Sequence, residues 1–111
     1  MSARQSEHIC VKFQSAVDLL ARRWTPIILQ LLLQRRSLRY SDLYEQLQVV
    51  SEKVLIQRLK EMEQAGLIER RVINVTPVRV EYELSEKGRA LGRVIGGIQR
   101  WADEWIAPPQ H

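Results

Sequence analysis

The chain has 111 residues, of which 45% are hydrophobic and 27% are charged, a balance typical of one folded domain and unlike that of a disordered chain. Its longest apolar run, residues 27–33, is interrupted by Gln30 and is too short to cross a membrane, and no secretory leader pattern opens the sequence, so we expect a cytoplasmic protein without membrane contacts. One cysteine and two histidines near opposite ends exclude a disulfide framework and predict neither a metal site nor a cofactor.

Positive charge is concentrated in the middle of the chain. Residues 22–79 contain eleven Lys or Arg and six Asp or Glu, whereas the remaining residues contain six and seven, which gives the whole chain a net charge of +4. Such a basic segment is either an ordinary solvated face or the electrostatic footprint of a nucleic-acid partner. The pattern of elements decides between these two interpretations.

Residues 1–9 show no usable periodicity and are predicted to form a flexible N-terminal arm. From residue 10 to residue 21, Phe13, Val17 and Leu20 recur at spacings of four and three, which predicts a helix. A second helix is expected to begin with Thr25 as its cap and Pro26 in its first turn, where a missing N–H costs nothing.

Two further helices are predicted before the sequence changes character. The first is short and covers residues 40–47, and the second covers residues 51–65, with Ser51 as its cap and Gly66 just beyond its end. In the longer helix the spacing places three apolar side chains toward a core, namely Leu55, Leu59 and Met62. The other faces then carry the polar residues Glu52, Lys53, Gln57 and Lys60, and the apolar Ile56 lies among them.

From residue 67 to residue 84 the helical pattern disappears. Apolar and charged residues alternate from Val78 to Leu84, which predicts a strand, and the segment NVTP at 74–77 is the expected turn of a hairpin. After Ser85 the apolar spacing returns to three and four, which predicts a helix over residues 85–106 that ends before Pro108.

Four helices, two strands and a last helix indicate an α+β, mostly helical fold within one domain, residues 10–107. The order is typical of a winged helix-turn-helix with an added N-terminal helix and a long C-terminal helix. Residues 51–65 would be the recognition helix in the DNA major groove, and residues 67–84 would be the wing. This layout predicts a DNA-binding protein whose partner is double-stranded DNA.

Site residues follow from this layout and from side-chain chemistry. Candidates for reading base edges lie at the start of the recognition helix: Ser51, Glu52, Lys53, Ile56 and Gln57. Candidates for phosphate contacts lie at the start of the preceding helix, one turn further along the recognition helix, and on the wing: Arg39, Ser41, Lys60, Arg70, Arg71 and Arg79. Arg71 and Arg79 have an alternative, because they can instead form surface ion pairs with Glu69 and Glu81.

The last helix carries more apolar surface than a domain of this size readily buries. It can fold back on its own domain or pack against a second copy, and we expect a second copy. The predicted dimer surface uses the first and last helices: Phe13, Val17, Leu91, Val94, Ile95, Ile98, Trp101 and Trp105.

Four segments resemble, in the same order, motifs of the HxlR family of bacterial winged-helix transcription regulators. They read ARRWTPIILQLL, LRYSDLYEQL, VSEKVLIQRLKEMEQAGLIERRV and TPVRVEYELSEKG, within about residues 16–92. The resemblance implies a homodimeric DNA-binding regulator, more commonly a repressor, paired through its first and last helices. It places Ser51, Glu52, Lys53 and Ile56 on the face that reads DNA.

The sequence departs from the family pattern at three places. Residues 21–23 are Ala-Arg-Arg where the family usually has Gly-Gly-Lys, which favours a helix that continues through this turn. Ile56 replaces a usual Thr or Ser, which indicates a different operator. Cys10 is followed by Val11 rather than by Pro, so it is either a small apolar residue at a helix start or a redox sensor, and a small-molecule or redox effector remains open.

Two other functions compete with this interpretation. A winged-helix domain can bind protein instead of DNA, but the polar Lys53, Gln57 and Lys60 argue against a protein-binding face on the recognition helix. An enzyme is not expected, because no glycine-rich phosphate loop, nucleophile motif or close pair of catalytic carboxylates occurs in the sequence.

Overall fold

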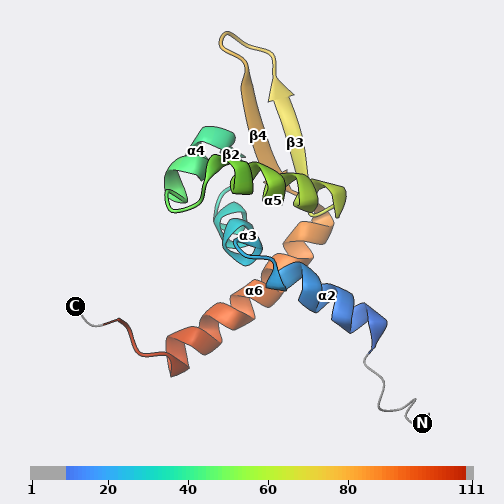
Figure 1. The fold of residues 1–111 in the computed structure, drawn as a ribbon, viewed down its shortest axis with the longest axis vertical. Coiled ribbons are helices and arrows are strands. Elements are labelled where there is room, and N and C mark those ends of the chain that lie inside the picture. Colours follow the sequence, from blue (N-terminus) through green and yellow to red (C-terminus); the bar gives the residue numbers. More distant parts are fainter. Residues whose placement is uncertain (1–9, 110–111) are drawn as a thin grey trace.

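The computed structural model describes residues 10–109, so the prediction of a flexible arm at residues 1–9 lies outside the described residues. The described chain forms five helices and a small sheet (Figure 1). In chain order they are α2 Val11–Ala21, α3 Thr25–Gln34, β2 Leu38–Arg39, α4 Tyr40–Gln46, α5 Glu52–Gln64, β3 Ile68–Ile73, β4 Arg79–Leu84 and α6 Glu86–Trp105. The predicted helices and the hairpin are therefore confirmed, with ends that differ by one or two residues.

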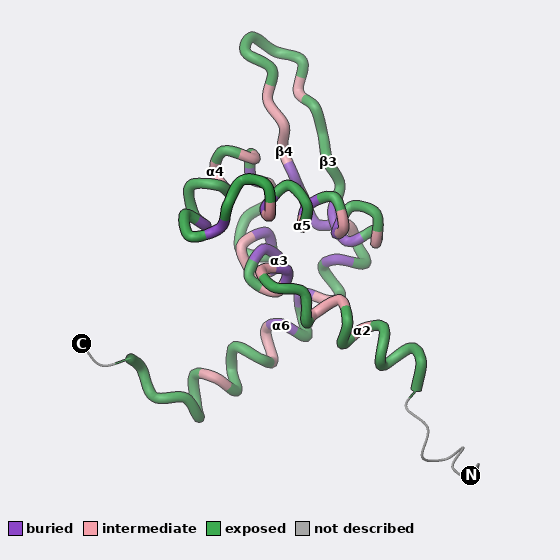
Figure 2. Tube along the Cα trace, in the orientation of Figure 1, coloured by how far each residue is buried: buried purple, intermediate pink, exposed green. Residues whose placement is uncertain are grey.

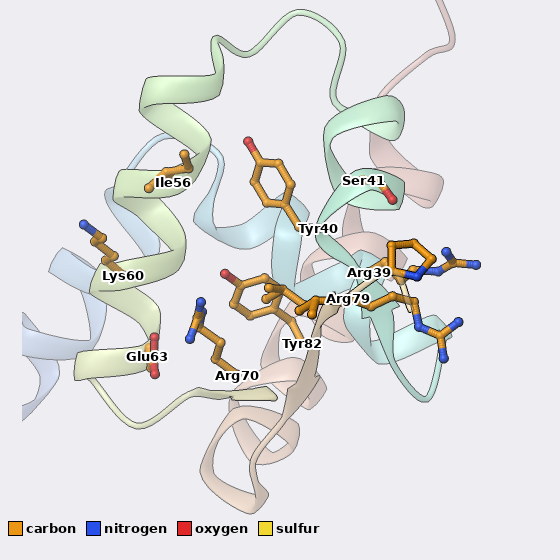
Figure 3. A pocket seen from close by; sticks show the side chains of 12 residues that line it. Arg39, Tyr40, Ser41, Ile56, Lys60, Glu63, Arg70, Arg79 and Tyr82 are labelled. Carbon is orange, nitrogen blue, oxygen red and sulfur yellow. The ribbon is translucent and has the colours of Figure 1, made fainter. Parts of the chain in front are cut away.

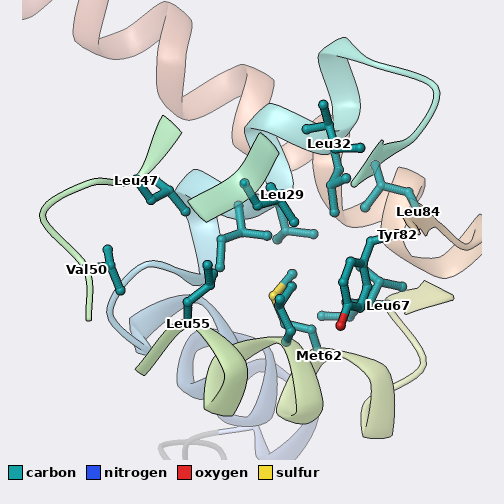
Figure 4. Close-up of a cluster of buried hydrophobic side chains, with 14 of the residues drawn as sticks. Leu29, Leu32, Leu47, Val50, Leu55, Met62, Leu67, Tyr82 and Leu84 are labelled. Carbon is teal, nitrogen blue, oxygen red and sulfur yellow. The ribbon is translucent and has the colours of Figure 1, made fainter. Parts of the chain in front are cut away.

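One hydrophobic core joins α3, α4, α5 and the base of the hairpin (Figure 4). The spacing of three and four along α5 buries Leu55, Leu59 and Met62, each at most 2% exposed. Across from them lie Leu29 of α3 and Tyr82 of β4. Because this core holds α5 by its inner face, the outer face of α5 is left free for a partner.

The sheet has three antiparallel strands in the order β2-β4-β3. β3 and β4 pair from Ile68 opposite Leu84 to Ile73 opposite Arg79, which is the predicted hairpin. The two-residue strand β2, which places Leu38 opposite Tyr82, was not predicted. Two residues are too few to show a period of two, so only the tertiary structure could reveal this strand.

The ends of α5 are formed as the sequence predicted. The hydroxyl of Ser51 accepts a hydrogen bond from the N–H of Val54 at 3.2 Å, which satisfies one of the free donors of the first turn. Gly66 ends the helix with a φ of 77°, in the left-handed region that glycine occupies without strain. The start and length of α5 are thus fixed by local sequence.

The turn between α2 and α3 differs from the prediction in two ways. α2 ends at Ala21 and does not continue through residues 21–23, and the N-cap of α3 is Trp24, not Thr25. Trp24 has a φ of 79°, which is uncommon for a bulky residue, and Thr25 is the buried first residue of the helix. Trp24 packs against the core and Thr25 is buried, and this tertiary packing overrides the helical propensity of Arg22 and Arg23.

The helix α6 has two different halves. Its first half packs on the domain through Gly88, Gly92 and Ile95, which are all buried. Its second half extends away from the domain and is exposed along most of its length (Figures 1 and 2). Among residues 10–109, no helix is both long and apolar enough to cross a bilayer.

Candidate nucleic-acid interface

The helix-turn-helix unit is formed by α4 and α5, and its outer surface is made by the side chains of α5 that the core does not use. Lys53, Gln57 and Lys60 are all exposed on this surface. Ile56 is 40% exposed although it is apolar. The predicted base-reading residues therefore lie together at the start of α5, on the side that faces solvent.

A cleft of about 660 Å³ lies between α5, the start of α4 and the wing (Figure 3). One helix wall is formed by Ile56, Lys60 and Glu63 of α5, and the other wall by Tyr40 and Ser41 of α4. The remaining lining comes from β2 and the hairpin: Arg39, Arg70, Pro77, Val78, Arg79, Val80 and Tyr82. Residues from four separate segments of the sequence are thus brought to one concave surface.

The cleft is strongly basic. Its lining includes four cations, Arg39, Lys60, Arg70 and Arg79, and one carboxylate, Glu63. Each of these four cations was predicted to contact phosphate, as was Ser41, which also lines the cleft. A concave surface with this excess of positive charge attracts a polyanion.

Arg70 and Arg71 are neighbours on β3 but lie on opposite faces of the wing, because successive side chains of a strand alternate. Arg70 pairs across the sheet with Tyr82 and lines the cleft. Arg71 does not line the cleft, and its guanidinium lies 2.6 Å from the carboxylate of Glu83. The structure thus separates Arg71 from the other predicted phosphate contacts, and its ion-pair partner is Glu83 rather than the predicted Glu69.

Arg79 lies at the start of β4, where it both lines the cleft and pairs with Glu81 at 3.7 Å. The predicted ion pair with Glu81 is therefore present, and the phosphate contact of Arg79 stays a prediction. Its buried Nε has no hydrogen-bond partner among the described residues. In Figure 3 the guanidinium groups of Arg79 and Arg39 extend in the same direction, away from Lys60.

Two of the predicted base-reading residues already have partners within the chain. The Ser51 hydroxyl accepts the capping hydrogen bond from the N–H of Val54, which leaves its O–H and its second lone pair for a partner. The carboxylate of Glu52 accepts a hydrogen bond from the Tyr40 hydroxyl at 3.1 Å. Burial and the nearby Glu52 carboxylate raise the pKa of Tyr40 to about 12, so this phenol remains a donor at neutral pH.

Sequence reasoning identified Ile56 and Ser41 but did not identify three other uncharged residues that line the cleft, namely Tyr40, Val80 and Tyr82. Tyr82 is buried, and Tyr40 and Val80 are partly buried and pack against the core. Val80 and Tyr82 reach the cleft from β4, which lies between β2 and β3 in the sheet, and Tyr40 reaches it from the start of α4. The pairing of strands distant in sequence leaves no periodic signal, so no pattern in the sequence marks these residues.

Most of the predicted dimer surface is exposed in the single chain: Phe13 is 67%, Val94 50%, Ile98 52%, Trp101 60% and Trp105 67% exposed. Val17 is also exposed, and Leu91 packs partly against the core. Ile95 is the exception, because it is only 6% exposed and belongs to the core of its own chain. The helical periodicity could not separate these roles, since one wide apolar stripe serves both the core and the exposed face.

Cys10 is the N-cap residue of α2 and is exposed. It is therefore not packed as a small apolar residue in the core of the single chain. Within residues 10–109 there is no group of three or more His, Cys, Asp or Glu side chains placed to hold a metal ion.

Comparison with known proteins agrees with this geometry. The HxlR-like helix-turn-helix family matches residues 19–110. The uncharacterized HTH-type transcriptional regulator YvaP of Bacillus subtilis is 47% identical over 104 residues, which cover 94% of each chain. The HTH-type transcriptional regulator YodB of the same organism is 41% identical over 100 residues, covering 90% of this chain and 88% of YodB.

Solved structures show the same similarity. The reduced form of YodB superposes with a TM-score of 0.78 at 40% identity and covers 93% of this chain and 100% of that chain. Quinone-bound YodB gives a TM-score of 0.75 at 38% identity and covers 87% of this chain and 100% of that chain. From the match over most of its length and from its fold, the chain belongs to the HxlR-like helix-turn-helix family and is a DNA-binding transcription regulator.

Proposed function

We propose that this regulator is a homodimeric repressor that binds a two-fold symmetric DNA site. The observation that carries the proposal is the basic cleft between α5 and the wing, which four cations line beside the exposed face of the helix. A DNA strand fits such a surface, with its phosphates on the cations and its base edges against the first turns of α5.

The proposed contacts are of two chemical kinds: contacts to base edges, which select the DNA sequence, and contacts to phosphates, which hold the DNA backbone. In the major groove, Gln57 is suited to bridge adenine, Lys53 to donate to guanine, and Ile56 to pack on a thymine methyl group. Arg39, Lys60, Arg70 and Arg79 supply charge that is independent of sequence, with Ser41 as a further donor at the start of α4. Bound DNA would thus be recognised by α5 and held by the cleft.

The dimer is supported by the exposed apolar side chains of α2 and α6. Val94, Ile98, Trp101 and Trp105 are each at least half exposed on one helix, which is unfavourable in water unless another surface covers them. A second copy offers the same surface and gives a closed two-fold assembly. Two α5 helices would then read half-sites about 10 bp apart, or a multiple of that spacing.

Selection from a random duplex library at about physiological salt, with the mass of the protein measured on the same sample, tests the proposal. We expect an enriched inverted repeat and the mass of a dimer. Repression is then checked by a reporter gene placed behind the selected site. Weak binding without enrichment, even at low salt, would contradict direct recognition of DNA by α5.

We also infer that a redox or quinone effector acts through Cys10. Two observations support this: the thiol is exposed, and the relative YodB has been solved in a reduced form, after diamide treatment and with bound quinone. Cys10 is the sole cysteine of the chain, so any thiol chemistry of this protein occurs there. Its place at the start of α2 adjoins the helix whose exposed residues are proposed to form the dimer.

The effector proposal predicts that a quinone weakens DNA binding by the parent protein and leaves Cys10→Ser unaffected. Binding to the selected duplex is measured by fluorescence anisotropy before and after treatment, and mass spectrometry reports the adduct. An adduct on Cys10 with unchanged DNA affinity would show that the cysteine is reactive but not regulatory.

A further inference from the structure

A hydrogen bond joins the two helices of the helix-turn-helix at the point where α5 begins. The hydroxyl of Tyr40, the first residue of α4, donates to the Oε2 atom of Glu52, the first residue of α5, at 3.1 Å. Figure 3 shows the Tyr40 hydroxyl pointing away from the Tyr82 side of the cleft. This bond fixes one oxygen of a carboxylate that lies at the leading end of the recognition helix.

The Tyr40 side chain is itself held in place. Its ring stacks on that of Tyr44, one turn along α4, with centroids 6.2 Å apart and planes 7° from parallel. The start of α4 is fixed by Asp42, whose carboxylate accepts the backbone N–H of Arg39 at 3.1 Å. Glu52 therefore accepts its hydrogen bond from a donor whose position is set by α4 and not by DNA.

A carboxylate at this place has a specific consequence for DNA recognition. It repels phosphates, and the one favourable partner that the major groove offers it is an exocyclic amino group, above all N4 of cytosine. Glutamate has three rotatable bonds, and a free carboxylate would lose rotamer entropy when it is ordered against a base. The hydrogen bond from Tyr40 orders the Glu52 carboxylate before DNA binds. It therefore removes part of this entropy cost and leaves the second carboxylate oxygen free to accept a hydrogen bond from a base.

We propose that Tyr40 is a positioning residue that holds Glu52 so that its free oxygen accepts a hydrogen bond from the amino group of a cytosine in each half-site. Tyr40 touches no base in this arrangement and acts only through Glu52. The inference rests on the proposed placement of α5 in the major groove. It adds a specificity determinant that lies outside the recognition helix.

The experiment compares duplexes that carry each of the four base pairs at every position of the selected half-site. Glu52→Ala identifies the position that Glu52 reads, because the preference for cytosine over thymine is lost only there. Tyr40→Phe is then expected to lower that preference about fivefold and to leave the salt dependence of binding unchanged. In the Glu52→Ala background, Tyr40→Phe should have no further effect on base preference.

Two further variants distinguish positioning from a merely structural role. Tyr44→Phe removes the hydroxyl of the stacked neighbour but keeps the bond between Tyr40 and Glu52, so it should retain the parent preference. In the Glu52→Gln variant, the Tyr40 hydroxyl donates to the amide oxygen, so the amide NH₂ group faces the base. The base preference should then shift to a base with a carbonyl group in the major groove, thymine or guanine. Tyr40→Phe in the Glu52→Gln protein should reduce this new preference, because the amide is then free to flip.

The outcomes separate the inference from the function on which it rests. Full cytosine preference in Tyr40→Phe, or an equal loss with and without Glu52, would overturn the positioning role and leave recognition by α5 intact. No change of preference in Glu52→Ala at any position would overturn both the placement of Glu52 and the role of Tyr40. A change in thermal stability without a change in base preference would show that the bond only joins α4 to α5.

Discussion

At the residue scale, Gly88 shows why one small side chain is required in the last helix. A Cβ atom at this position would overlap the backbone carbonyl oxygen of Leu67 and would lie 3.1 Å from Cδ2 of Leu84. A backbone carbonyl cannot rotate out of the way as a flexible side chain can. The glycine therefore lets α6 begin directly against the base of the wing.

Gly88→Ala is expected to lower the free energy of unfolding by about 2–3 kcal/mol, because the inserted methyl group forces the backbone of α6 away from Leu67. Gly96→Ala is the matched control on the same helix, since the nearest atom to its Cβ is the guanidinium of Arg100 at 3.6 Å. That variant should be stabilised by up to about 1 kcal/mol through helix propensity. Urea unfolding measures both, and equal effects of the two changes would contradict the contact at Leu67.

Residues whose role is local were correctly predicted from sequence. Ser51 caps α5 and Gly66 ends it because these roles depend only on the backbone of one or two turns. Thr25 was wrong as a cap because Trp24, in the left-handed conformation, holds the cap position while it packs against the core, and Thr25 is buried. By local preference Thr25, a short polar residue before Pro26, was the better candidate for the cap of α3. The tertiary environment instead placed Trp24 at the cap position.

At the element scale, the wing is a hairpin with two chemically different faces. The alternation of side chains places Arg70 in the cleft and Arg71 in an ion pair with Glu83 on the other face. The sequence showed both arginines and the alternation, but it did not show which face of the hairpin is directed toward α5. That orientation is set when β4 pairs with β2 and β3 on either side.

Arg70→Ala is expected to weaken DNA binding to all sequences and to reduce the slope of log affinity against log salt by about one phosphate contact. Arg71→Ala removes the same charge from the adjacent residue but should change the affinity and the slope less, because its guanidinium is held by Glu83 away from the cleft. Binding is measured by anisotropy between low and physiological salt. Identical salt slopes for the two variants would show that the cleft does not hold the phosphates.

At the scale of the whole molecule, α6 divides its surface between the core and solvent. Ile95 is buried in its own domain, whereas Ile98 and Trp101, three and six residues further along, are 52% and 60% exposed. One face of α6 therefore packs on the core, and the neighbouring apolar face is exposed to solvent. A protein with such an exposed apolar face gains stability when a second surface covers it.

Ile98→Glu is expected to convert the dimer into a monomer and to weaken binding to the selected two-fold site at least tenfold, because both half-sites are then no longer bound together. Arg100→Glu places the same carboxylate two residues away, on nearly the opposite face of α6, and should leave the dimer intact. Sedimentation equilibrium gives the mass of each variant. A dimeric Ile98→Glu protein would show that the second copy packs elsewhere.

The sequence by itself determined the order and type of the helices and of the β3–β4 hairpin, the buried face and both ends of α5, and, through its ordered motifs, the family of the protein. These features depend on periodicity and on local backbone chemistry, which are read along the chain. Only the tertiary structure decided which wing face meets α5, which residue of α6 enters the core, and that Tyr40 bonds to Glu52. These features depend on contacts between segments that lie apart in the sequence, and the pairing of β2 with β4, which helps to orient the wing, involves only two residues on β2.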